Sequence, residues 1–293
     1  MARSKALDEL VRLLDLERIE ENLFRGASRD LGWGTVFGGQ VLGQALAAAT
    51  HTVPAERDVH SLNAYFLRPG NVTRPIVYDV DRIRDGTSFS TRRVVAIQSG
   101  EPIFNLAASF HKREEGFEHQ DEMPDVPPPE TFPTDEERAA QSQELPPKVR
   151  ALAVEEGPFE SRSVDSLDSP IHPAPRPPIR RVWVRANGEL PDDPALHRNL
   201  LAYASDRAFV TTALFPHGAA WMTPGMQVAS LDHVMWFHRP FRIDEWLLYV
   251  MESSTAQGAR GLTHGRFFTR DGRLVASTAQ EGLIRLRAKR PAV

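Results

Sequence analysis

Residues 38–49 read GGQVLGQALAAA, and this stretch decides the fold class of the 293-residue chain. It has the composition of a helix, but small residues occupy most of its faces. Glycine in an exposed helix costs about 0.5–1 kcal/mol relative to alanine, so three glycines here predict a close approach by another part of the protein. A long helix over 38–50 that is wrapped by a curved sheet would meet this condition.

The segments after this helix predict an antiparallel sheet. Apolar and polar residues alternate over 76–84, 88–98 and 103–110, as expected for strands with one buried face. Gly100 lies between the last two strands, where a tight hairpin needs a positive φ. The first part of the chain is therefore predicted to be a strand, a helix and an antiparallel meander.

The same order of elements recurs later in the chain, and this internal repeat is the most informative feature of the sequence. YFLRP at 65–69 parallels WFHRP at 236–240, and Gly272 occupies a second hairpin turn. The predicted fold class is α+β, with two repeats that each contain a central helix wrapped by an antiparallel sheet. The second helix and its strands are predicted over 194–205, 246–253, 260–269 and 274–282.

A proline-rich connector separates the two repeats. Proline removes a backbone donor and fixes φ, so the run from about 114 to 178 cannot form a central strand or a long helix. A short helix is expected inside it, around 136–143. We expect an N-terminal repeat over 1–112, the connector over 113–179 and a C-terminal repeat over 180–293.

Composition excludes several classes of function. A formal net charge of −4 creates no general attraction for nucleic acid. Because the chain has no cysteine, it has no disulfide, no thiol nucleophile and no thiolate metal site. No stretch approaches the roughly 20 apolar residues of a membrane span. We expect a cytoplasmic protein that needs no metal or cofactor.

Familiar catalytic motifs are missing. The GWG at 32–34 weakly resembles a dinucleotide-binding loop, but residues 24–31 are polar and arginine-rich rather than a buried parallel strand. The sequence has no G-x-S-x-G elbow, phosphate-binding loop or H-E-x-x-H motif. An oxidoreductase, a serine hydrolase of that type, a nucleotide hydrolase and a zinc protease are therefore disfavoured.

The chain resembles the acyl-CoA thioesterase II family, whose members are double hot-dog proteins of about this length. The resemblance runs from about residue 14 to residue 285 and implies hydrolysis of fatty acyl-CoA to free fatty acid and CoA. By analogy, it also implies a homodimer or homotetramer. Its motifs are VFGGQ at 36–40, YFLRPG at 65–70, RDG and SFS within 84–90, WFHRPF at 236–241 and VASTAQEG at 275–282.

The resemblance implies a water molecule held by an Asp, a Ser or Thr, and a Gln. The matching positions are Asp206 in YASD, Ser230 in ASLDH and Gln280 in TAQEG. These side chains suit thioester hydrolysis, which needs an aimed water, a proton acceptor and stabilisation of the oxyanion. No covalent intermediate is then required.

The repeat gives a check that does not depend on the family. The first-repeat counterparts of the three residues are Ala47, Val59 and Ala108, and all of them are apolar. A purely structural repeat would keep similar residues in both halves. One site per chain is therefore expected.

Further residues are candidates for binding the substrate. A backbone N–H near Gly38 or Gly39 could stabilise the oxyanion, since exposed donors and the helix dipole meet at a helix N-terminus. His60 could act as an acid or base, and Arg93 could contact a CoA phosphate. Asp232 and His233 are adjacent on a strand, so they face opposite sides and do not form a direct dyad.

Two other functions remain open on the same fold. An enoyl-CoA hydratase would need an Asp and a His that act on one water molecule. A noncatalytic module would bind acyl-CoA and leave it unchanged.

Overall fold

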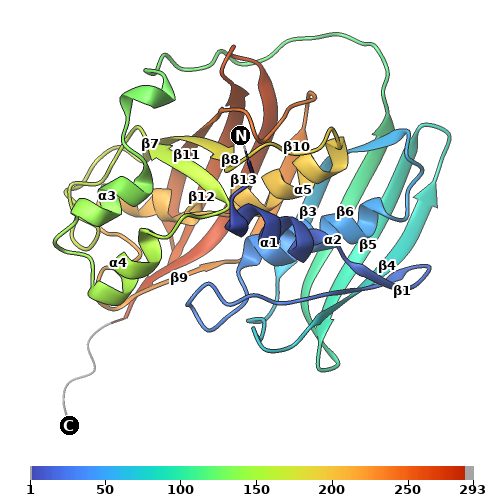
Figure 1. Cartoon of the computed structure of the whole chain (residues 1–293), viewed down its shortest axis with the longest axis horizontal. Coiled ribbons are helices and arrows are strands. Elements are labelled where there is room, and N and C mark those ends of the chain that lie inside the picture. The colour runs from blue at the N-terminus through green and yellow to red at the C-terminus, as the bar shows by residue number, and fades with distance from the viewer. Residues whose placement is uncertain (1, 288–293) are drawn as a thin grey trace.

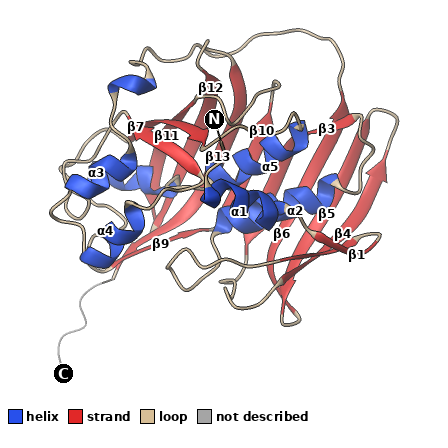
Figure 2. Cartoon of the chain, viewed as in Figure 1, coloured by secondary structure: helices blue, strands red, loops and turns tan. Residues whose placement is uncertain are grey.

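The computed structural model describes residues 2–287, and it confirms the double hot-dog prediction. Two helices lie on the inner face of one curved antiparallel sheet (Figures 1 and 2). The first repeat contains β2 (Leu23–Gly26), α2 (Gly38–Thr50), β3 (Arg57–Phe66), β4 (Ile76–Asp85), β5 (Phe89–Gln98) and β6 (Glu101–Lys112). The second contains β8 (Ile179–Ala186), α5 (Pro194–Ser205), β9 (Met226–Ser230), β10 (Asp232–Phe237), β11 (Leu247–Gln257), β12 (Arg260–Thr269) and β13 (Leu274–Leu286).

The strand order shows the repeat directly. It is β2-β4-β5-β6-β3 in the first half and β8-β11-β12-β13-β10 in the second, so corresponding strands occupy corresponding places. The halves meet where β3 pairs antiparallel with β10, with Tyr65 opposite Asp232 and Ser61 opposite Trp236. The two half-sheets therefore form one continuous sheet around both helices.

The glycines of α2 allow the two central helices to touch. A Cβ atom on Gly39 would lie 2.3 Å from the carbonyl oxygen of Tyr203 in α5, and one on Gly43 would lie 3.1 Å from that of Asn199. Almost every residue of α2 is buried. The close approach expected from residues 38–49 is therefore made by the backbone of the other repeat's helix.

The predicted hairpins are present. Ser99 and Gly100 have φ of 54° and 83° in the turn between β5 and β6, and Gly272 has φ of 88° between β12 and β13. Positive φ is the conformation that glycine adopts without steric penalty. The turn residues therefore end the strands where the sequence pattern placed them.

The connector packs against the second half of the sheet. It leaves β6, crosses to the other end of the molecule and forms the short helices there (Figure 1). Met123, Val126 and Phe132 pack against a small cluster that includes Trp183, and the Trp183 indole donates to the Pro127 carbonyl at 3.0 Å. Its elements are η1 (Pro129–Thr131), α3 (Asp135–Gln141), α4 (Pro147–Ala153) and β7 (Phe159–Ser163), which pairs with β8.

The remaining N-terminal elements close one side of the helix pair. These are α1 (Lys5–Leu14) and β1 (Glu17–Glu20), and Leu7, Leu10 and Leu14 of α1 are buried. A short 3-10 helix, η2 (Val210–His217), follows α5 and covers part of the second half-sheet. Between residues 2 and 287, no helix is both long and apolar enough to cross a membrane.

We predict that Gly43→Val lowers the free energy of unfolding by about 2 kcal/mol, the scale of an overpacked core. The new side chain would begin 3.0 Å from Leu14 and 3.1 Å from the Asn199 carbonyl. Urea denaturation would measure the change. Gly116→Val is the control, because a Cβ there meets no atom of residues 2–287 within 4 Å; equal stability of the two variants would contradict the prediction.

Candidate active site

The structure brings Asp206, Ser230 and Gln280 together. Asp206 caps the C-terminus of α5, Ser230 ends β9 and Gln280 lies on the inner face of β13. The Ser230 hydroxyl donates to Asp206 Oδ1 at 3.0 Å, and the Gln280 amide Nε2 donates to the same oxygen at 2.7 Å. Asp206 Oδ1 therefore accepts a hydrogen bond from each of the other two side chains.

The first repeat supplies the other side of the site. The backbone N–H of Gly39, at the start of α2, donates to the Asp206 carboxylate. A Cβ on Gly38 would lie 2.6 Å from Asp206 Oδ2, so only glycine leaves room for the carboxylate. The N-terminus of α2 thus meets the C-terminus of α5 at Asp206, and the positive end of the α2 dipole faces the carboxylate.

The environment makes Asp206 an unusually strong base for a carboxylate. Burial raises its pKa to about 6, although the hydrogen bonds from Gln280, Ser230 and Gly39 act in the opposite direction. Desolvation disfavours the charged form, whereas donors to the carboxylate favour it, and here desolvation is the larger effect. The group is ionised at neutral pH and still able to accept a proton.

A cavity of about 260 Å³ opens onto these residues. It is lined by residues of the 33–38 segment, by the 206–211 segment and by the end of β9. Asp206 and Ser230 line it, but Gln280 does not, and only 1% of the Gln280 side chain is exposed. Gln280 therefore binds the carboxylate from outside the cavity.

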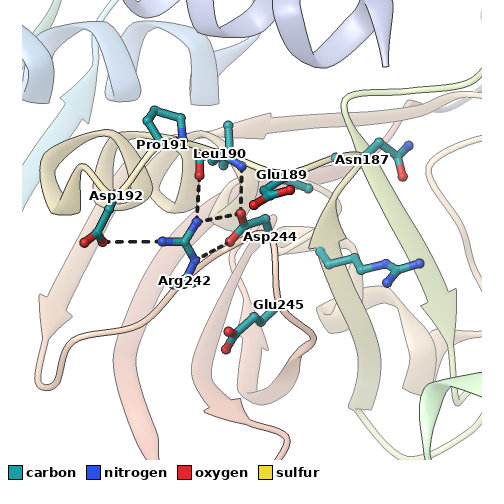
Figure 3. Close-up of a pocket in the computed structure, with 11 residues that line it drawn as sticks. Asn187, Glu189, Leu190, Pro191, Asp192, Arg242, Asp244 and Glu245 are labelled. Atoms are coloured by element: carbon teal, nitrogen blue, oxygen red, sulfur yellow. Dashed lines mark hydrogen bonds and ion pairs between the residues drawn. The ribbon is translucent and has the colours of Figure 1, made fainter. Parts of the chain in front are cut away.

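A larger cavity of about 610 Å³ lies near the N-terminus of α5, at the other end of that helix (Figure 3). Three of its charged side chains, Arg242, Asp244 and Asp192, form ion pairs. Arg242 contacts Asp244 at 2.9 Å and Asp192 at 3.4 Å, while Asp244 also accepts from the Leu190 N–H at 2.7 Å. Although burial acts to raise it, the hydrogen bonds from Arg242 and the Leu190 N–H lower the pKa of Asp244, which makes it a weaker base, so size alone does not make this cavity the catalytic centre.

The structure does not bring His60 and Arg93 to this cluster. Both lie on the face of the first half-sheet that points away from α2, because neighbouring residues on a strand face opposite sides. His60 contacts the Ser109 hydroxyl at 2.8 Å, and Arg93 pairs with Asp81 at 2.9 Å. Each has a partner on that outer face.

In the structure, Ala47 is not the first-repeat counterpart of Asp206, contrary to the prediction. Asp206 caps α5, and the residue that caps α2 is His51, so Ala47 inside α2 is not its counterpart. The sequence gives no marker for register across a helix, which explains the error.

The strand register supports the other two correspondences, Ser230 with Val59 and Gln280 with Ala108. Ser230 lies opposite Gly282, and Val59 lies opposite Phe110, at corresponding places in the two repeats. Val59 and Ala108 are buried and apolar. The first repeat therefore lacks the hydroxyl and the amide of the second.

Two features of the cavity were missed in the sequence. Trp33 lines it from a loop in which Asp30 Oδ1 accepts the N–H groups of Gly32, Trp33 and Gly34 at 2.8–3.1 Å. An Asp with glycines two and four residues later is a turn pattern that could have located this loop. Ala208, just after Asp206, has a φ of 56°, which the sequence does not indicate.

Comparisons with known proteins identify the class first. The fold matches a protein with a hot-dog fold from Alicyclobacillus acidocaldarius, with a TM-score of 0.76 and 21% identity over 97% of this chain and 100% of that one. An acyl-CoA thioesterase II from Mycobacterium marinum matches with a TM-score of 0.79 and 42% identity, covering 96% of this chain and 100% of the other. The architecture is thus that of hot-dog thioesterases.

Sequence comparisons then give the family. Models for acyl-CoA thioesterase and for the acyl-CoA thioesterase N-terminal domain match residues 175–283 and 28–111. Acyl-CoA thioesterase 2 of Haemophilus influenzae is 46% identical over 96% of this chain and 99% of its own length. Acyl-coenzyme A thioesterase 8 of Homo sapiens is 41% identical over 94% and 88%. The chain belongs to the acyl-CoA thioesterase family.

We predict that Gln280→Met raises the pKa of Asp206 above its value of about 6. The substitution removes an N–H donor at 2.7 Å that favours the ionised carboxylate, and it keeps a side chain of similar size. Carbon-13 NMR titration of labelled aspartate would follow the change. Gln257→Met, at the exposed end of β11, should leave the titration as it is; an unchanged Asp206 pKa in Gln280→Met would refute the prediction.

Proposed function

We propose that this chain hydrolyses fatty acyl-CoA to free fatty acid and CoA, with Asp206 as the general base. The observation that carries the proposal is a buried carboxylate with a pKa raised to about 6, which lines a cavity and is held by Ser230 and Gln280. A general base works best when its pKa lies near the operating pH. The family to which the chain belongs supports the thioester as substrate.

The reaction begins with a water molecule in the cavity between Asp206 and Ser230. Asp206 takes a proton as the water oxygen attacks the thioester carbonyl carbon, and the Ser230 oxygen accepts the other hydrogen. The tetrahedral intermediate collapses, the C–S bond breaks, and the proton on Asp206 passes to the departing CoA sulfur. Gln280 holds Asp206 Oδ1 throughout, so the carboxylate keeps its direction.

The start of α2 suits the charge that develops on the carbonyl oxygen. Gly38 lines the cavity, whereas the N–H of Gly39 already donates to Asp206. We therefore assign oxyanion stabilisation to the Gly38 N–H and to the positive end of the α2 dipole. Because α2 comes from the first repeat and Asp206 from the second, both repeats contribute to one site.

The arrangement favours hydrolysis over hydration of an enoyl-CoA. Hydration would need a His beside Asp206 on the same water, but no His lines the cavity in residues 2–287. His233 is fully buried, and its ring contacts the Ser205 hydroxyl at 2.9 Å. A module that only binds acyl-CoA would not need a carboxylate with a raised pKa.

We also propose a homodimer or homotetramer in the cytoplasm. Assembly is supported by Tyr65 and Trp236, which are 58% and 41% exposed on the outer face of the sheet near the β3–β10 junction. Exposed aromatic side chains of this kind are enriched in protein interfaces. The lack of cysteine, and therefore of disulfides, is compatible with a reducing compartment such as the cytoplasm.

We predict that Asp206→Asn lowers the rate of free thiol release from a medium-chain acyl-CoA by about 100-fold or more, as expected for loss of a general base. Circular dichroism would show that the variant is folded, and Asp79→Asn on an exposed part of β4 is the control. If the wild-type protein is inactive at every chain length, a binding module becomes the better assignment. Full activity of Asp206→Asn would instead move the site elsewhere.

We predict that kcat/KM of the wild-type protein falls about tenfold per pH unit below pH 6. Only ionised Asp206 can accept the proton, and its pKa is about 6, so lower pH removes the active form. In Ser230→Ala the pH at which activity falls should move upward, because a hydrogen bond that favours the ionised form is lost. A profile that stays flat down to pH 5 would rule out Asp206 as the base.

A further inference from the structure

Three buried polar side chains form a row behind Asp206. Thr263 of β12 lies directly opposite Gln280 of β13, and the register of β10 with β13, continued by one residue, places His233 opposite Gln280 on the other side. All three face the helices and are at most 1% exposed. Neighbouring strands are about 4.8 Å apart, so these side chains are next to one another on the inner face.

Within residues 2–287, each member of the row has one polar atom without a hydrogen-bond partner. These atoms are Thr263 Oγ1, Gln280 Oε1 and His233 Nδ1. A buried polar atom that lacks a hydrogen bond costs about 1–3 kcal/mol, and native proteins rarely leave three of them side by side. Their position on adjacent strands indicates one shared partner.

The hydrogen-bond roles of the three atoms follow from their neighbours. The Ser205 hydroxyl donates its only hydrogen to the Ala202 carbonyl at 2.9 Å, so it must accept from His233 Nε2. Burial lowers the pKa of His233 to about 3, so the ring is neutral and Nδ1 is an acceptor. Gln280 Oε1 is also an acceptor, whereas the Thr263 hydroxyl has a hydrogen to donate.

We propose that one buried water molecule joins Thr263, Gln280 and His233, and that Thr263 and His233 are positioning residues for Gln280. Such a water donates one hydrogen to Gln280 Oε1 and the other to His233 Nδ1, and it accepts the Thr263 hydroxyl. Two acceptors and one donor match the capacity of a single water with three hydrogen bonds, the usual number for an internal water.

This water differs from the one that attacks the substrate. None of the three residues lines the cavity at Asp206. The Phe209 ring packs edge-on against His233 with centroids 5.9 Å apart, and Val210 packs against Gly282 beside Gln280. The row is therefore closed off by the segment that leads into η2.

The row fixes the direction of the Gln280 amide. With Oε1 bound to the water, Nε2 points at Asp206 Oδ1 and donates to it at 2.7 Å. A rotation by 180° would place the amide oxygen against the carboxylate and an N–H₂ group against the water's hydrogens. The inference rests on the proposed function, because an oriented Gln280 matters for catalysis only if Asp206 is the base.

The test uses three substitutions in the full chain. Thr263→Val removes the hydroxyl at nearly constant volume, and we expect kcat to fall about tenfold with KM unchanged. Thr263→Ser keeps the donor and should retain wild-type kcat. Thr212→Val is the control, because Thr212 is another fully buried threonine whose hydroxyl has no partner among the described residues, and it lies in η2 outside the row.

A high-resolution crystal structure of the wild-type protein completes the test. A water within hydrogen-bond distance of all three atoms, together with loss of kcat in Thr263→Val alone, supports the inference. It is overturned if no water occupies the row, if Thr263→Val keeps full kcat, or if Thr212→Val loses as much. Wild-type protein that releases no thiol would refute the proposed function. The positioning roles of Thr263 and His233 would then be refuted too, because they depend on Asp206 as the base. The crystal structure would still decide whether the water is present.

Discussion

The backbone contact between α2 and α5 is the constraint on which the rest of the structure depends. A side chain at Gly39 would collide with the Tyr203 carbonyl, and one at Gly38 would collide with the Asp206 carboxylate. Only because both positions are glycine can one helix end at the point where the other begins. The curved sheet, the buried carboxylate and the cavity are arranged around this meeting point.

This contact creates an electrostatic conflict at Asp206. The carboxylate is removed from water and lies at the C-terminus of its own helix, and both effects disfavour its charge. The start of α2 and the donors on Ser230 and Gln280 compensate only in part, so the pKa settles at about 6 rather than near 4. A better solvated carboxylate would be more stable and a weaker base.

The sequence was sufficient for the main helices and strands, and its resemblance to the family named the three candidate site residues. Apolar periodicity, glycine turns and the repeat gave α2, α5 and the strands, since each depends on local patterns. Ser230 and Gln280 stood out because their counterparts, Val59 and Ala108, are apolar. These inferences needed no knowledge of how distant segments pack.

The sequence could not predict how distant segments pack against one another. His60 and Arg93 could be assigned to strands, but which face of the sheet they occupy depends on bulges and partners. Proline content showed that the connector could not be a central strand, yet it gave no hint that β7 would extend the sheet. Ala47 was wrongly aligned with Asp206 because the sequence does not show which residue of one helix corresponds to which residue of the other.

The two repeats, joined in one sheet by the pairing of β3 with β10, belong to a single chain, so equivalent places in them can carry different residues. Two separate copies of one repeat would be related by symmetry. There would then be two equivalent helix junctions, each formed by the end of one central helix and the start of the other, and any residue placed at one junction would also appear at the other. In a single chain the two junctions are independent: Asp206 occupies one, and His51 occupies the equivalent place at the other. The covalent link also makes the meeting of the two helix ends independent of protein concentration, so dilution cannot separate the helix end that bears Asp206 from the helix end that faces it.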